Sequence, residues 1–129
     1  MSEHNPNIIS PLVLAYIGDG VYELFVRNKL IDLFPTTPPS KLHKLSSSHV
    51  KAHAQSNSMK AIEPILSERE LMVYKRGRNA KSSTVPKNAD VTDYRRATGF
   101  EALVGYLYLN RENERLNEIM ELAFLNYSE

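Results

Sequence analysis

The chain has 129 residues, a formal net charge of +1 and no cysteine. This length suits a single domain over residues 1–129 that buries about two thirds of its unfolded surface without disulfides, and the lack of cysteine excludes thiolate metal sites. The N-terminus has no basic region followed by an apolar core, and no apolar run approaches about 18 residues. We therefore expect a soluble, cytoplasmic protein that is neither exported nor bound to a membrane.

The first predicted helix begins at Ser10 and Pro11, a hydroxyl cap followed by proline at the first helical position, and continues to about Leu33. Its residues 12–26 read LVLAYIGDGVYELFV, which is apolar almost all the way round at 100° per residue. This pattern predicts a helix in the middle of a bundle.

A charged residue interrupts this apolar stretch. Asp19 stands between Gly18 and Gly20. A carboxylate in an apolar wall costs several kcal/mol unless its lost hydration is compensated, and each glycine costs a helix about 1 kcal/mol relative to alanine. We interpret two penalties at one place as a sign of function, because the glycines leave room for a cation or a phosphate beside the carboxylate.

The middle of the chain predicts two further helices. One is capped by Ser40 and extends through Met59 to about Ile62, where Pro64 closes it. The next begins at Ser67 in the sequence SERE, which matches a capping box and precedes a short apolar face.

A basic segment follows. Residues 75–87, KRGRNAKSSTVPK, have no apolar periodicity and read as an exposed loop. Residues 75–96 hold seven Lys or Arg against two Asp, a net charge of +5 on a chain that is only +1 overall. This concentration predicts a polyanionic partner.

Two helices complete the chain, one over residues 91–109 that is capped by Asp90 or Thr92, and an amphipathic one over residues 112–126. No convincing strand and no repeat is visible. The sequence therefore predicts an all-α bundle of about five to seven helices.

The helix over residues 91–109 places a second carboxylate, Glu101, on an inward face. If this helix packs on the first at about 8–10 Å, Asp19 and Glu101 can face one another. Two ionised carboxylates about 5 Å apart repel by about 3 kcal/mol at an effective dielectric of about 20. A shared proton, a Lys or Arg, or a divalent cation would relieve this repulsion, and hard oxygen ligands on rigid helices suit Mg²⁺.

Two motifs now resemble a known family. LAYIGDGVYE, residues 14–23, resembles the ribonuclease III signature L-G-D-A/S-V, and TGFEALVGYLY, residues 98–108, resembles its second signature, D-x-x-E-A-x-x-G-A-x-Y. The closest resemblance is to the Mini-ribonuclease III form, which has the catalytic domain and no double-stranded-RNA-binding domain. The family's fold, an all-α and dimeric endonuclease domain, is therefore expected over the whole chain.

The resemblance carries over to Asp19 and Glu101 as catalytic metal ligands. Two acidic positions of full-length ribonuclease III are replaced here by Ala15 and Thr98, so one firmly held Mg²⁺, with a second recruited with the RNA, is our working picture. Glu23 and Thr98 are expected to orient these two ligands without binding the metal themselves.

The implied activity is hydrolysis of phosphodiester bonds in double-stranded regions of structured RNA, with Mg²⁺, or Mn²⁺ as a substitute, orienting a water and leaving 5′-phosphate and 3′-hydroxyl ends. The resemblance further implies a homodimer that matures precursor 23S ribosomal RNA in ribosome biogenesis, with a large-subunit ribosomal protein as a possible accessory. A duplex is recognised mainly through its phosphates and 2′-hydroxyls. The residues expected to contact RNA are Arg76, Arg78, Lys81, Lys87, Arg95 and Arg96.

Other interpretations remain open at this point. Ala15 and Thr98 also suit a non-catalytic RNA-binding or ribosome-assembly module on the same fold, and a purely structural dimerisation module is a third hypothesis. His49 and His53 have the i, i+4 spacing of zinc ligands but no visible third ligand, so we favour packing or surface roles.

Overall fold

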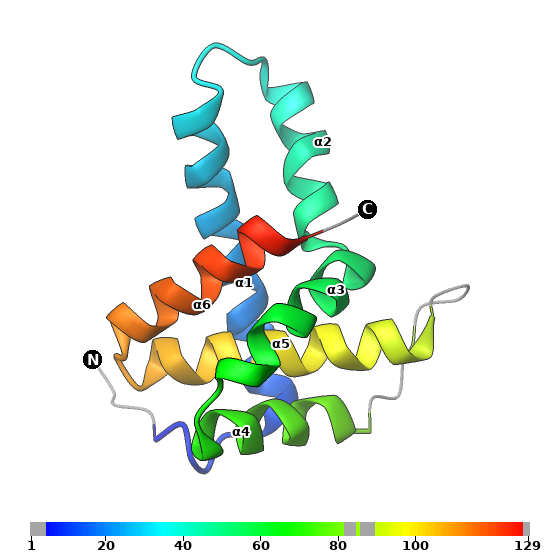
Figure 1. Cartoon of the computed structure of the whole chain (residues 1–129), viewed down its shortest axis with the longest axis vertical. Helices are drawn as coiled ribbons and strands as arrows, with labels where there is room; N and C mark the ends of the chain where they lie inside the picture. Colours follow the sequence, from blue (N-terminus) through cyan, green and yellow to red (C-terminus); the bar gives the residue numbers. More distant parts are fainter. Residues whose placement is uncertain (1–4, 82–84, 86–89, 128–129) are drawn as a thin grey trace.

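The structure is a computed structural model that describes residues 5–81, 85 and 90–127. Within these residues it contains six α-helices, one 3₁₀ turn and no strand, as the sequence predicts (Figure 1). No described helix combines the length and the hydropathy that a membrane span requires. The elements are α1 (Pro11–Leu33), α2 (Pro39–Val50), α3 (Ala52–Ile62), η1 (Glu63–Ile65), α4 (Glu68–Asn79), α5 (Val91–Leu109) and α6 (Asn113–Asn126).

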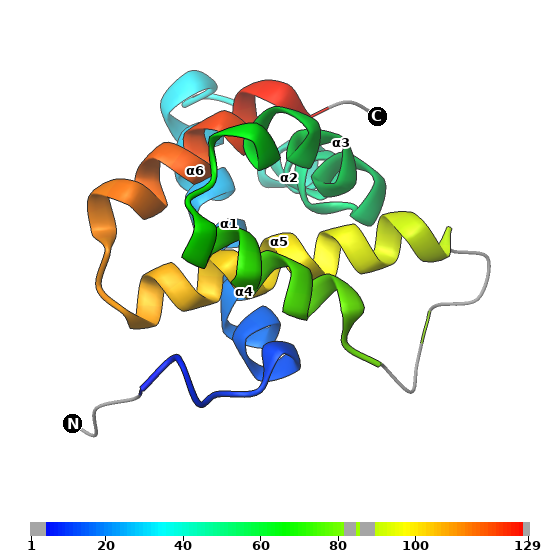
Figure 2. The same ribbon diagram turned by 60° about the horizontal axis from the view of Figure 1, so that its bottom comes forward.

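Helix α5 is the centre of the bundle. It packs against α1, α3, α4 and α6, and Figure 2 shows the N-terminal half of α1 on one side of it and α3 and α6 on the other. Phe100, Leu103, Val104 and Leu107 of this helix are completely buried. The second motif of the sequence therefore lies in the core.

Helices α1 and α5 cross in direct backbone contact. A Cβ atom on Gly18 would lie 1.8 Å from the carbonyl oxygen of Glu101, and one on Gly105 would lie 2.0 Å from that of Leu14. No side chain fits in so short a distance, so glycine is required at both places. The glycine before Asp19 thus serves helix packing, whereas a Cβ on Gly20 would meet nothing within 4 Å.

The prediction that α1 is enclosed all round is wrong. Leu14, Tyr22 and Val26 are buried against the bundle, but Val13 and Leu24 are more than half exposed. A single chain offers α5 and its neighbours as cover for only one side of this helix. The other side remains an exposed apolar surface.

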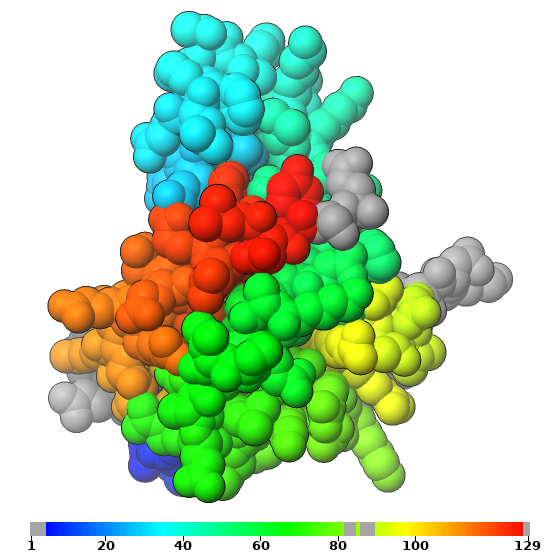
Figure 3. Space-filling view, in the orientation of Figure 1, coloured from blue at the N-terminus to red at the C-terminus, as the bar shows by residue number. Residues whose placement is uncertain are grey.

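The single helix predicted from Ser40 to Ile62 is also wrong, because it is two helices. The backbone at Lys51 is extended, with φ −60° and ψ 147°, and it ends α2 and begins α3. Pro38 rather than Ser40 is the residue that precedes α2. Helix α2 and the C-terminal half of α1 form a hairpin that projects from the bundle (Figures 1 and 3), while α3 turns to pack on α5.

The start of α4 is confirmed and its end is not. The Ser67 hydroxyl accepts a hydrogen bond from the backbone of Glu70, whose carboxylate accepts one in return. The helix continues to Asn79, through residues predicted to form a loop, because Gly77 allows it to approach α5, where a Cβ would lie 2.7 Å from that of Ala102. Its basic last turn also suits the negative end of the helix dipole. Asp90 caps α5 as predicted.

Candidate active site

A cleft of about 460 Å³ opens beside the crossing of α1 and α5. Helix α5 contributes residues at positions 94, 97, 98 and 101, which share one face of the helix. The remaining walls come from the N-terminal half of α1 and from the junction of α2 and α3. The cleft is lined by Leu12, Ala15, Tyr16, Asp19, Val50, Ala52, Gln55, Tyr94, Ala97, Thr98 and Glu101.

The structure brings Asp19 and Glu101 together, as the sequence analysis expects. Both line the cleft, and their carboxyl groups are close enough to share a hydrogen bond. Their environments differ, however. Asp19 is exposed at the rim, although the sequence predicts a carboxylate in an apolar wall, and Glu101 lies deeper. The cost of desolvation therefore falls on Glu101.

The pKa of the Glu101 carboxyl is raised to about 9. Burial is the largest cause, the hydrogen bond to Asp19 and the charge of Asp19 also raise the pKa, and the amide of Gln55 lowers it. Two carboxyl groups that share a proton carry one negative charge between them. A cation that replaced the proton would allow both groups to be ionised.

These two groups fit Mg²⁺ better than a metal that needs a full set of protein ligands. No set of three or more His, Asp or Glu residues able to hold a metal occurs in the described part of the chain. Mg²⁺ keeps several waters and binds through one or two carboxylates plus substrate phosphates, whereas structural zinc needs four protein ligands. Asp19 and Glu101 would be the protein ligands, and the cleft leaves room for water and phosphate.

Glu23 and Thr98 have other partners in this structure. The Glu23 carboxylate accepts a hydrogen bond from Arg27 at 3.4 Å and does not line the cleft. Thr98 does line it, but its hydroxyl donates to the backbone oxygen of Tyr94 at 2.9 Å. A supporting role for either residue stays a prediction.

Arg76 and Arg78, which the sequence predicts in a loop, lie in the last turn of α4. Arg76 lines a groove of about 650 Å³ between α4 and the start of α1, together with Lys75. The guanidinium of Arg78 lies 5.7 Å from the ring centre of Tyr74. Lys81 is exposed just after the helix. Lys87 lies outside the described residues.

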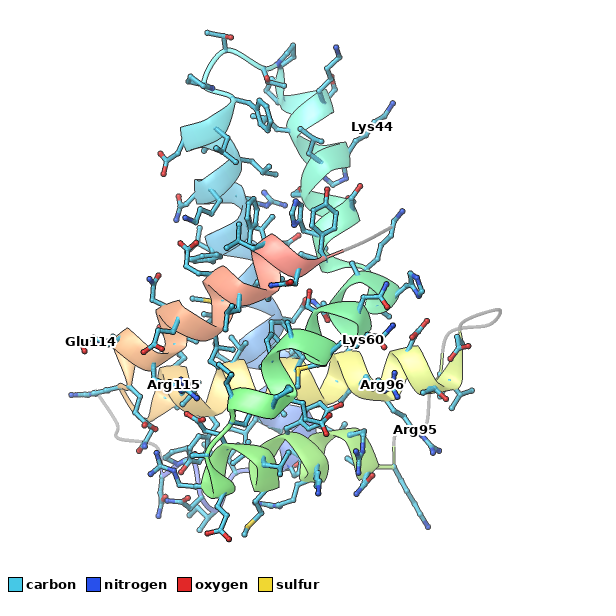
Figure 4. The ribbon with its side chains drawn as sticks, viewed as in Figure 1. Lys44, Lys60, Arg95, Arg96, Glu114 and Arg115 are labelled. Atoms are coloured by element: carbon cyan, nitrogen blue, oxygen red, sulfur yellow. The ribbon has the colours of Figure 1, made fainter. Side chains whose placement is uncertain are left out.

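Arg95 and Arg96 do not share the face of α5 that lines the cleft. Arg95 is exposed. Arg96 lines a separate pocket of about 420 Å³ with Lys60 and Glu63, and Figure 4 shows Lys60 and Arg96 next to each other on the side turned to the viewer. The predicted RNA contacts are thus spread over more than one face.

The two histidines have packing and surface contacts, as we favour from the sequence. The ring of His49 is buried and lies 4.3 Å from the Phe124 ring centre. His53 Nδ1 lies 2.8 Å from an oxygen of Asp93, which joins α3 to the start of α5.

Sequence reasoning missed Gln55 and Lys60. Gln55 is an amide that the structure buries beside the carboxylates, and a single glutamine in a polar helix carries no visible signal. Lys60 lies in the sequence outside the basic segment, and only the packing of α3 on α5 brings it to Arg96.

Comparisons with known proteins identify relatives of this chain. Residues 12–112 match the model of the ribonuclease III domain. The chain is 54% identical to Mini-ribonuclease 3 of Clostridium tetani, over 94% of this chain and 80% of that protein, and 51% identical to Mini-ribonuclease 3 of Brevibacillus brevis, over 93% and 89%. A crystal structure of protein FN1578 from Fusobacterium nucleatum has a TM-score of 0.81 and 32% identity, over 91% of this chain and 93% of that one.

Proposed function

Because this chain belongs to the ribonuclease III family and is an endoribonuclease, we propose that it cuts double-stranded regions of structured RNA with Mg²⁺ held by Asp19 and Glu101. Mn²⁺ is expected to substitute. The observation that carries the proposal is that these two carboxyl groups, far apart in sequence, meet in one open cleft.

Asp19 and Glu101 have different positions in the proposed metal site. Asp19 at the rim and Glu101 deeper in the cleft would hold the cation together, and its positive charge would favour the ionised form of the Glu101 carboxyl. Mg²⁺ bound there would supply an activated water and would neutralise charge that develops on the phosphate. The crossing at Gly18 and Gly105 holds both ligands on rigid backbone, so little reorganisation is needed during the reaction.

The RNA contacts are proposed on the basic surface. Our candidates are Arg76, Arg78, Lys81, Lys87 and Arg95, together with Arg96 on the side of α5 turned away from the cleft. Phosphate contacts of this kind position a duplex and make binding depend on salt.

A second copy of the chain is the proposed cover for the exposed side of α1. Val13, Tyr16, Leu24 and Ile31 are 54%, 82%, 61% and 53% exposed along one side of this helix, and Gly20 between them has no neighbour within 4 Å of a Cβ position. Such a stripe favours close approach of another apolar surface, and a two-fold dimer matches the local symmetry of a duplex.

This homodimer is tested by sedimentation at several concentrations. Leu24→Glu should shift the protein toward monomer, because it places a charge in the stripe that the proposed dimer would cover. Leu125, on α6, is also an exposed leucine, so Leu125→Glu is the matched control and should sediment as the parent protein does. A monomeric parent protein would contradict the proposal.

The proposed cellular substrate is precursor 23S ribosomal RNA, cut in the cytoplasm during ribosome biogenesis, with a large-subunit ribosomal protein as a possible accessory. Incubation of purified protein with this precursor and Mg²⁺ should yield discrete products with 5′-phosphate and 3′-hydroxyl ends. Chelation of the metal or Asp19→Asn should abolish them. Binding of duplex RNA without metal-dependent products would instead favour a non-catalytic RNA-binding module.

A further inference from the structure

The amide of Gln55 on α3 lies in the cleft and has no part in the proposed reaction. Gln55 is only 2% exposed and lines the cleft beside Asp19 and Glu101. Its Nε2 atom is buried and has no hydrogen-bond partner of standard geometry in the described part of the chain. Leaving such a donor unsatisfied costs about 1–3 kcal/mol, so its position calls for an acceptor inside the cleft.

The Glu101 carboxyl is that partner by position and by chemistry. Both side chains line the cleft, and the Gln55 amide is close enough to the Glu101 carboxyl to hydrogen-bond with it. An amide N–H donates, and a carboxylate oxygen is a strong acceptor for it.

Two other residues on the cleft wall, Ala15 and Thr98, cannot hold Glu101 in this way. Ala15, on the same wall, has only a methyl group, and the Thr98 hydroxyl already donates to the backbone of its own helix. A carboxylate with no outer partner is free to rotate, and outer partners of metal ligands are worth about 10–100-fold in metal affinity.

We propose that Gln55 is a positioning residue, whose Nε2 atom donates to one oxygen of Glu101 and leaves the other oxygen free for a divalent cation. The inference rests on the proposed metal site at Asp19 and Glu101. It assigns to α3 a part in metal binding that neither signature motif contains.

The experiment measures metal binding directly, with Tb³⁺ as a luminescent probe and Mg²⁺ as its competitor. Tyr16 and Tyr94 line the cleft and can sensitise the ion. Gln55→Met keeps the length of the side chain and removes the donor, and it should weaken both ions by about tenfold or more. Ser58→Ala is the matched control on α3, because Ser58 is equally buried but donates to Ala123 at 2.9 Å, away from the cleft.

The outcomes separate the two proposals. If Gln55→Met binds both ions as the parent protein does while Asp19→Asn does not, the inference is wrong and the metal site stands. If Asp19→Asn and Glu101→Gln also bind normally, the metal site itself is wrong. Gln55→Asn is a second variant, for use if Gln55→Met does not fold, and it shortens the side chain by one methylene while keeping the amide. It should also weaken metal binding. Affinity equal to that of the parent protein would overturn the inference.

Discussion

Two sites on opposite sides of α5 differ in charge and in the way their side chains are held. On one side, Asp19 and Glu101 meet where two helix backbones touch at Gly18. On the other, Lys60 and Arg96 stand on the wall of an open pocket. The carboxylates are short side chains on helices in direct contact, so their relative positions are fixed. The long cationic side chains are flexible and can move to meet a phosphate. From this comparison we expect that substitution of either cleft carboxylate abolishes activity. Substitutions of the basic residues should each weaken RNA binding by a small amount, and these losses should add.

Loss of either carboxylate should have the largest effect. Asp19→Asn and Glu101→Gln should each lower single-turnover cleavage of duplex RNA by about 10³-fold or more, because each removes several kcal/mol of metal-dependent stabilisation. The double variant should be little worse than either one, since the two groups act as a unit. Effects that multiply in the double variant would show that the two groups act independently.

Gly18→Ala, at the crossing of α1 and α5, should be strongly destabilising. Its Cβ would lie 1.8 Å from the Glu101 carbonyl oxygen, so the two helices must separate, at a cost of about 3 kcal/mol or more. Urea unfolding measures this free energy. Gly20→Ala meets no neighbour in the chain and should instead gain up to about 1 kcal/mol of helix propensity; equal losses in both variants would refute the close crossing.

The raised pKa of Glu101 predicts how stability depends on pH without metal. The pKa of this carboxyl is 4.5 in the unfolded chain and about 9 in the folded protein. Between these two pH values the folded state therefore binds more protons than the unfolded state. Stability should therefore fall as pH rises through this window, by up to about 1.4 kcal/mol per pH unit.

Glu101→Gln tests this slope, because it cannot ionise. Without divalent ions, the unfolding free energy of the parent protein should fall from pH 5 to pH 8 relative to that of the variant. A constant difference would show that Glu101 is already ionised in the folded protein.

Single changes in the basic residues should have the smallest effects. Arg76→Gln and Arg95→Gln should each weaken duplex binding by less than about tenfold and reduce the salt slope by about one. Arg96→Gln should weaken it less than Arg95→Gln, because Arg96 lies with Lys60 away from the cleft. Binding is measured in an Asp19→Asn background, and a larger loss in Arg96→Gln would place the duplex on the pocket side of α5.

Local signals predicted much of this fold correctly. The capping residues Ser67 and Asp90 are where the sequence places them, because a cap depends only on residues a few positions away. The break at Lys51 was missed, since neither proline nor glycine marks it and its cause is the packing of α3 on α5.

The sequence by itself determined an all-α chain, a basic segment and the pair Asp19 and Glu101, because periodicity, charge and motif are properties of the order of residues. Only the tertiary structure decided that Glu101 rather than Asp19 bears the desolvation, that Gln55 reaches it, and that Arg96 faces away from both. Burial and proximity depend on which surfaces cover one another, and these surfaces come from helices far apart along the chain.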